Sequence, residues 1–121
     1  MSTVRVLVVD DDRDLREAII DLLGDEGYDV ASAENGAEAL EALRNTLPHI
    51  ILLDLMMPVI DGYEFRARQL ADPCTAHIPV IAMTASGSED QRIHVLQAQA
   101  FMRKPFDFKL LLSLIELHAT R

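Results

Sequence analysis

Residues 4–12 read VRVLVVDDD, a short apolar run that leads directly into three aspartates. The run from Val4 to Val9 is rich in β-branched side chains, as expected for a strand that is buried on both faces of a parallel sheet. Ligands of such sheets bind beyond the carboxyl ends of the strands. This stretch therefore predicts an α/β fold whose chemistry lies in the residues that follow each strand.

Helical and strand-like segments alternate along the rest of the chain. Apolar residues recur with helical spacing from Leu15 to Leu23, and Gly24 and Gly27 stand where that helix should end. Five strand–helix units in strict alternation predict a doubly wound parallel sheet with helices on both faces. The remaining strands are predicted over 28–33, 50–53, 78–83 and 100–103, and the remaining helices over 37–46, 62–70, 89–97 and 107–118.

The composition limits the size and the partners of the chain. Its 121 residues, half of them hydrophobic, fit one domain with one substantial core. A formal net charge of −9 argues against direct binding to nucleic acid or to an anionic membrane. The single cysteine, Cys74, excludes an internal disulfide and suits a reducing compartment.

The apolar run at the N-terminus is too short for a signal peptide or a membrane span. We therefore expect a soluble, cytoplasmic domain over residues 1–121, with no output domain in this chain.

Groups of complementary chemistry follow four of the five predicted strands: Asp10, Asp11 and Asp12 after the first, Asp54 after the third, Thr84 after the fourth and Lys104 after the fifth. Carboxylates crowded at one sheet edge repel each other, and a hard divalent cation such as Mg²⁺ resolves this repulsion. A hydroxyl and an ammonium group nearby would suit a bound phosphoryl group. Each residue alone also has a structural interpretation, with Asp12 or Asp14 as a helix cap, Thr84 as a polar strand end and Lys104 as a surface lysine.

Four motifs carry a resemblance to a known family. They are VVDD at residues 8–11, DLMMPVIDG at 54–62, TA at 84–85 and KPF at 104–106, and they extend over essentially the whole chain. Together they resemble the receiver domain of two-component response regulators. The resemblance implies a flavodoxin-like fold with five helices and a five-stranded parallel sheet in the order 2-1-3-4-5.

The resemblance also implies a role for each residue at the acidic edge. Asp54 would be the phosphoacceptor, and it would hold Mg²⁺ together with Asp11 and the backbone carbonyl of Met56. Asp10 would act on the cation mainly through a bound water. The phosphoryl donor would be a phosphohistidine on a histidine kinase or on a histidine phosphotransfer protein. The chain would then be no conventional enzyme, but a phosphoacceptor that assists its own phosphorylation and autodephosphorylation.

A second group of residues would transmit the phosphorylation. Thr84 would donate its hydroxyl to a phosphoryl oxygen, and Lys104 would pair with the phosphoryl group, aimed by a cis peptide bond before Pro105. Movement of Thr84 would leave space for Phe101, whose ring would swing from exposed to buried; the alternative is a plain core phenylalanine. A downstream protein or a second receiver copy would then bind the remodelled face, which consists of the segments 89–97, 100–103 and 107–118.

Some positions depart from the family pattern or vary within it. Gln97 stands where the family commonly has a glycine that ends a helix, so the geometry there must avoid or tolerate a left-handed cap. Met56 and Ser86 are neither acids nor amides, so we expect no specially accelerated autodephosphorylation.

The last helix has a second apolar stripe at Leu110, Leu114 and Leu117. Two explanations are open: the stripe docks a partner, or it consists of scattered exposed leucines.

Three other function classes fit the sequence less well. An aspartyl phosphatase would need an acid/base carboxylate two places after its nucleophile, where Met56 stands, and a cap domain for its substrate. A degenerate receiver that only binds partners would gain nothing from mutually repelling carboxylates. A nucleotide-binding module would need a glycine-rich phosphate loop after the first strand. The four histidines share no metal-site spacing, and Cys74 has no neighbouring base, so we assign them no catalytic role.

Overall fold

The computed structural model describes residues 3–85 and 94–119. Five parallel strands form one sheet in the order β2-β1-β3-β4-β5, which confirms the predicted topology. The order places β1 and β3 side by side at the centre of the sheet. The strands are β1 (Arg5–Val9), β2 (Asp29–Ala33), β3 (Ile50–Asp54), β4 (Val80–Thr84) and β5 (Ala100–Arg103).

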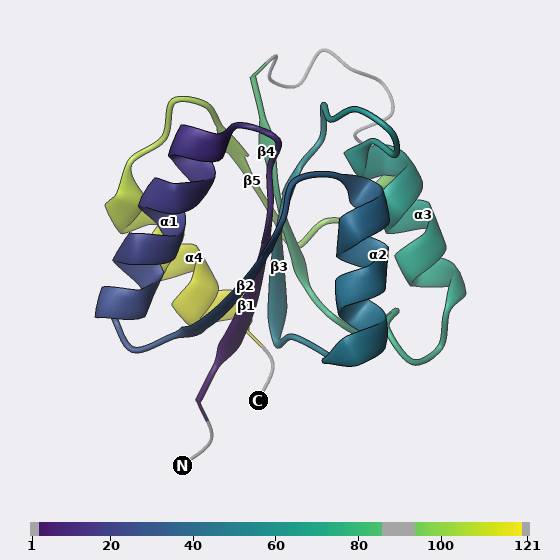
Figure 1. Ribbon diagram of the computed structural model, residues 1–121, viewed down its shortest axis with the longest axis horizontal. Coiled ribbons are helices and arrows are strands. Elements are labelled where there is room, and N and C mark those ends of the chain that lie inside the picture. Colours follow the sequence, from purple (N-terminus) through teal and green to yellow (C-terminus); the bar gives the residue numbers. More distant parts are fainter. Residues whose placement is uncertain (1–2, 86–93, 120–121) are drawn as a thin grey trace.

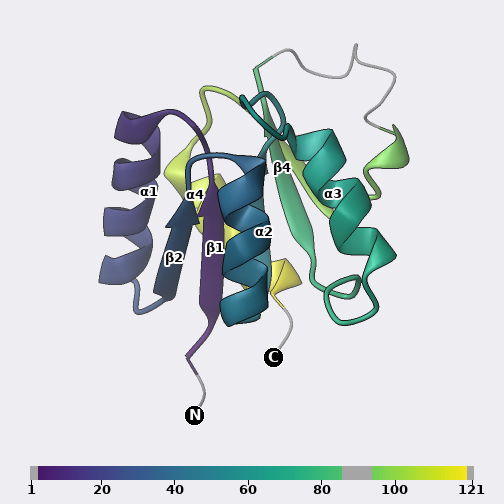
Figure 2. The same cartoon turned by 45° about the vertical axis from the view of Figure 1, so that its right-hand side comes forward.

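Helices cover both faces of the sheet, as the alternating pattern predicts. The described ranges contain α1 (Arg13–Asp25), α2 (Gly36–Asn45), α3 (Gly62–Ala71) and α4 (Phe108–His118). Helices α1 and α4 lie on one face, and α2 and α3 lie on the other (Figure 1). The turned view shows β1 and β2 running side by side between α1 and α2 (Figure 2).

Two hydrophobic clusters, one on each face, hold these layers together. Successive side chains of a strand point to opposite faces, so Val6 and Val8 pack toward α1 and α4, whereas Leu7 and Val9 pack toward α2 and α3. Strands β1, β3 and β4 are apolar on both faces because helices cover both. This burial fixes the register of the central strands and therefore the places of the residues that follow them.

The helix starts are set by aspartate and asparagine caps. The Asp12 carboxylate accepts a hydrogen bond from the Leu15 N–H at 3.2 Å, so Asp12 is the N-cap of α1, as its structural interpretation predicts. Asp107 caps α4 in the same way, with a 2.8 Å hydrogen bond from the Lys109 N–H. Helix α1 ends at Asp25, shortly before Gly27 adopts a φ of 91°.

Two predicted boundaries differ from the structure. The helix predicted over 89–97 falls mainly on residues that lie outside the described ones, which exclude 86–93; within the described residues, His94 and Val95 have 3₁₀ conformation, and Leu96 and Gln97 are not helical. The fourth strand begins at Val80 rather than at residue 78. Pro79 has no N–H to donate to a strand ladder, and only its carbonyl is used, as acceptor for the Ile51 N–H.

Candidate functional site

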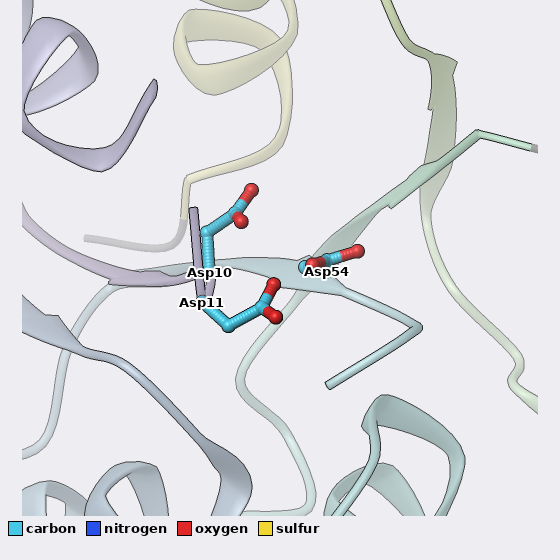
Figure 3. A group of neighbouring side chains, drawn as sticks. All are labelled: Asp10, Asp11 and Asp54. Atoms are coloured by element: carbon cyan, nitrogen blue, oxygen red, sulfur yellow. The ribbon is translucent and has the colours of Figure 1, made fainter. Parts of the chain in front are cut away.

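The sheet topology brings three carboxylates together at the carboxyl ends of β1 and β3. Val9 is the register partner of Leu53, so the residues that follow them, Asp10 and Asp54, become neighbours. Asp11 follows Asp10 in the loop after β1, and the three side chains gather at this edge of the sheet (Figure 3). One carboxylate oxygen from each lies within 4.8 Å of the others. The cluster predicted from the strand ends therefore exists as a spatial unit.

Lys104 joins this cluster from the far end of the chain. Its backbone N–H donates to the Thr84 carbonyl at 2.8 Å, which continues the β4–β5 ladder past the end of β5. Its ammonium Nζ lies 2.8 Å from Asp10 Oδ2 and 3.6 Å from Asp54 Oδ2. A lysine that bridges two buried carboxylates has a defined place in the site, so the surface-lysine interpretation does not apply.

Asp10 and Asp11 differ sharply in their surroundings. Asp10 is fully buried, and its second oxygen, Oδ1, accepts from the Asp12 N–H at 2.9 Å. The Arg16 side chain donates from Nη1 to the Asp10 carbonyl at 2.7 Å, a contact that sequence spacing did not predict. Asp11 is exposed. Protein groups therefore occupy both oxygens of the Asp10 carboxylate, whereas Asp11 faces solvent at the mouth of the site.

Burial and like charge make Asp54 an unusual carboxyl group. Desolvation, followed by the neighbouring charge of Asp10, raises the pKa of Asp54 to about 7, although the Lys104 ammonium acts in the opposite direction. For Lys104, burial alone would lower the pKa, but the hydrogen bond from its ammonium to Asp10 and the charge of Asp54 outweigh burial and raise it. Lys104 therefore remains a cation while Asp54 titrates near neutrality.

The donor set fits a hard divalent cation. Three ionised carboxylates and one ammonium group leave two negative charges, which one divalent ion would cancel. All the donors are oxygens, and the exposed Asp11 leaves room for water ligands, both of which Mg²⁺ prefers. The Asp54 carboxylate, which burial and the charge of Asp10 disfavour, would be stabilised by such an ion. The acidic cluster thus has the character of the metal sites found in receiver domains.

The loop after β3 is packed tightly against the acceptor strand. The Met56 N–H donates to Asp54 Oδ1 at 3.3 Å, whereas the Met56 side chain is 60% exposed. A Cβ placed on Gly62 would lie 2.6 Å from the Asp54 carbonyl oxygen, so only glycine fits at the start of α3. Val59, in the same loop, has a φ of 71°, which β-branched residues rarely adopt. This loop therefore has little freedom around Asp54.

The other residues predicted for the site lie beside this cluster or on its flank. Thr84 is buried, with 5% of its surface exposed, and the Lys104–Pro105 peptide bond is cis. Phe101 is 43% exposed, so its interpretation as a plain core phenylalanine is wrong for this conformation. The Met56 carbonyl, assigned by resemblance to the metal, stays a prediction. Ser86 lies outside the described residues.

Several residues play structural parts that the sequence did not reveal. Arg66 and Gln69 of α3, together with Thr75, form a buried polar network behind the sheet. The helical spacing of Arg66 and Gln69 on a packed face was the available signal. His49 accepts a hydrogen bond from the Arg5 N–H through Nδ1 at 2.8 Å, which ties β1 to the turn before β3.

Two features lie away from the acidic edge. Cys74 is exposed and lines a cavity of about 460 Å³ between the C-terminal ends of α2 and α3. In α4, Leu111 and Ile115 face the sheet, whereas Leu110 and Leu117 of the second stripe are 45% and 74% exposed. No helix in the described ranges has the length and apolar character needed to cross a bilayer.

Comparison with known proteins gives a consistent result. The profile of the response regulator receiver domain matches residues 6–116. Response regulator MprA of Mycobacterium sp. (strain KMS) is 41% identical over 112 residues, which cover 91% of this chain and 48% of that protein. The chain thus spans about half the length of the curated relatives it matches.

Solved structures share the whole architecture. A putative response regulator from Chloroflexus aurantiacus superposes with a TM-score of 0.91 at 30% identity, covering 99% of this chain and 100% of that one. Chemotaxis response regulator CheY4 of Vibrio cholerae gives 0.89 at 29% identity, with 96% and 98% covered. The motifs, the sheet order, the acidic cluster with Lys104 and these matches agree: the chain belongs to the receiver domain family of response regulators, the phosphoacceptors of two-component signalling.

Proposed function

We propose that Asp54 accepts a phosphoryl group, in a Mg²⁺-dependent reaction, from a phosphohistidine of a cognate histidine kinase or histidine phosphotransfer protein. The observation that carries this proposal is the placement of Asp54 within one cluster with Asp10, Asp11 and the Lys104 ammonium. Receiver domains imply a histidine kinase partner as a family. We place this reaction in the cytoplasm, where such a thiol-containing, disulfide-free chain is stable.

The proposed step is a direct transfer to the carboxylate. An Asp54 carboxylate oxygen attacks phosphorus, the P–N bond of the phosphohistidine breaks, and its electron pair remains on the imidazole nitrogen. The product on this chain is an acyl phosphate. Attack requires the ionised carboxylate, which burial disfavours and the nearby ammonium of Lys104 favours.

The residues around Asp54 have separate tasks in this proposal. Asp11 and Asp54 would hold the cation together with the Met56 carbonyl, and Asp10 would act on it through a bound water. A bound Mg²⁺ supplies charge neutralisation for the phosphoryl oxygens. Lys104 leaves Asp54 to pair with the transferred group, a short movement because its ammonium already lies 3.6 Å from the acceptor oxygen.

The signal then passes through Thr84 and Phe101. The buried Thr84 hydroxyl turns to a phosphoryl oxygen, and the half-exposed ring of Phe101 moves into the space that this movement opens. Phe101 carries no hydroxyl, so its burial leaves no polar group to satisfy. The face that includes β5 and α4 then changes shape for a downstream protein or a second receiver copy. The exposed Leu110 and Leu117 lie on α4 of this face.

Intact-mass measurement after incubation with Mg²⁺ and acetyl phosphate tests the acceptor. We expect one phosphoryl adduct on the wild-type chain and none on Asp54→Asn. An Asp12→Asn variant is a matched control, because Asp12 is an acid of the same triplet that caps α1 instead of joining the cluster. An adduct that persists in Asp54→Asn, or its absence from the wild type together with an absence of Mg²⁺ binding, would contradict the proposal.

A further inference from the structure

A buried arginine behind the sheet plays no part in the proposed phosphoryl transfer. Arg66 of α3 is 2% exposed, and within the described part of the chain no carboxylate forms an ion pair with it. Burial lowers the pKa of its guanidinium. A buried cation without a counter-ion is costly unless its donors are well satisfied, so the partners of Arg66 reveal its purpose.

In the described part of the chain, two of the four hydrogen bonds of the Arg66 side chain go to backbone carbonyls of one distant turn, and the other two go to Gln69 and, at 3.4 Å, to the Ile78 carbonyl. Arg66 Nε donates to the Leu96 carbonyl at 2.8 Å, and Nη2 donates to the Gln97 carbonyl at 2.8 Å. These residues are 30 and 31 positions away along the chain. The planar guanidinium fork therefore holds two consecutive carbonyls, a geometry that lysine cannot reproduce.

A second polar side chain fixes the direction of the fork. Gln69 Oε1 accepts from Arg66 Nη1 at 2.8 Å. The Gln69 amide nitrogen donates in turn to the carbonyls of Thr75 and Ile78, at 3.0 and 2.9 Å. Arg66 is thus held in one orientation by α3 and by the segment between α3 and β4.

The turn that Arg66 holds is strained and leads directly into β5. Gln97 has a φ of 53°, a left-handed conformation that glycine adopts freely and other residues do not. Two residues later, the Gln99 N–H donates to the Val80 carbonyl and its side chain accepts from the Val80 N–H. Strand β5 starts at the next residue and carries Phe101. The position of this turn therefore sets where β5 begins.

We propose that Arg66 is a positioning residue of the switch: by holding the Leu96 and Gln97 carbonyls on α3, it stabilises the arrangement in which Phe101 is half exposed. The inference rests on the proposed function, since it assigns Phe101 a second position after phosphorylation. An interaction that is stronger in one arrangement than in the other shifts the population toward the first, and the proposal is that the Arg66 contacts are stronger in the half-exposed arrangement; their loss should then shift Phe101 away from its present place. The left-handed conformation of Gln97 adds to this effect, because the strained turn is less stable once the Arg66 hydrogen bond to the Gln97 carbonyl is lost.

A single-tryptophan reporter tests this directly. The chain has no tryptophan, so Phe101→Trp introduces one emitting group on β5. Emission is recorded with and without Mg²⁺ and beryllofluoride, which mimics a phosphoryl group on a carboxylate. In the reporter background, beryllofluoride should shift the emission to the blue as the ring becomes buried. Adding Arg66→Met should produce at least about a third of that shift without beryllofluoride.

Two further variants separate positioning from loss of stability. Arg66→Lys keeps the charge but loses the fork, so its emission should lie between those of the reporter and of Arg66→Met. Gln97→Gly removes the left-handed strain, so it should return the emission of Arg66→Met toward that of the reporter. If Arg66 only stabilised the fold, its substitution would lower the urea midpoint and leave the emission of the folded protein unchanged. Circular dichroism verifies folding. If Arg66→Met does not fold, the emission of Arg66→Lys is compared with that of the reporter instead.

The outcomes for the two proposals differ. Suppose that beryllofluoride shifts the emission of the reporter, but that without beryllofluoride the Arg66→Met and Arg66→Lys variants emit at the same wavelength as the unliganded reporter. The positioning role of Arg66 is then wrong and the switch stands. If beryllofluoride has no effect while the Arg66 variants still shift the emission, the phosphorylation switch at Phe101 is wrong and Arg66 still positions β5. If neither changes the emission, both proposals are wrong.

Discussion

Replacing Asp54 by asparagine should stabilise the metal-free protein at pH 8. In the folded state, the pKa of Asp54 is raised from its ordinary 3.8 to about 7, so the folded form binds this proton more tightly than the unfolded form does. The stabilisation by the proton is complete below pH 3.8 and is lost as the pH rises toward about 7. Asparagine has nearly the same shape and does not titrate, so it avoids this loss.

The size of the effect follows from the shift in pKa. A rise of about 3 pH units corresponds to an upper limit of about 4 kcal/mol between low and high pH. As the pH rises from 5 to 8, the difference in the free energy of unfolding between Asp54→Asn and the wild type should change by about 2–3 kcal/mol in favour of the variant. Part of the effect at pH 8 is offset because Lys104 then pairs with Asp10 alone. A net stabilisation of roughly 1–3 kcal/mol at pH 8 remains.

Urea denaturation in EDTA, followed by circular dichroism at pH 5 and pH 8, measures this difference. Lys104→Met is a control of opposite sign, because it removes the cation that opposes the rise in the pKa of Asp54. It should destabilise the protein more at pH 8 than at pH 5. The reasoning would be refuted if Asp54→Asn were less stable than the wild type at pH 8, or if the gap between them did not change with pH.

Three further variants test the surroundings of Asp54. Asp11→Asn should weaken Mg²⁺ binding at least about tenfold, since Asp11 is the exposed carboxylate of the cluster. Calorimetric titration measures the Mg²⁺ affinity, and an unchanged affinity would exclude Asp11 as a ligand. Gly62→Ala should lower the free energy of unfolding by about 1–3 kcal/mol, because the added Cβ would lie 2.6 Å from the Asp54 carbonyl oxygen. A urea midpoint equal to that of the wild type would show that the loop can shift to accommodate the methyl group. Asp12→Ala should cost about 1 kcal/mol through loss of the α1 cap while Mg²⁺ affinity stays unchanged, and weaker binding would place Asp12 in the site.

The sequence predicted the sheet and its acidic edge because both follow from local patterns. Apolar runs mark strands that are buried on both faces, and parallel strands align their carboxyl ends, so Asp10 and Asp54 were expected at the same edge of the sheet; they are neighbours there because β1 pairs with β3. Asp12 was expected as a possible cap from its place before a helical stripe, and it is one. Resemblance supplied the sheet order, which periodicity alone did not determine.

Contacts that depend on exact three-dimensional placement were beyond the sequence. Arginine usually lies at the surface, and nothing local to Arg66 indicates carbonyl partners 30 positions away. Gln97 illustrates an intermediate case, because its departure from the family glycine was visible, but only the structure shows that it accepts a φ of 53°. The half-exposed place of Phe101 likewise depends on how the turn before β5 is held.

The exposed Cys74 gives this protein a labelling site that needs no engineering. It is the only cysteine of the chain, so a maleimide dye attaches at one defined place. Its cavity includes Thr46 and Leu47, which precede β3, whereas Asp54 ends that strand, so the dye would sit at the opposite end of the sheet from the acidic cluster. Paired with a tryptophan donor on β5, such an acceptor would turn the switch into a change in energy transfer that stopped-flow fluorescence can follow in real time.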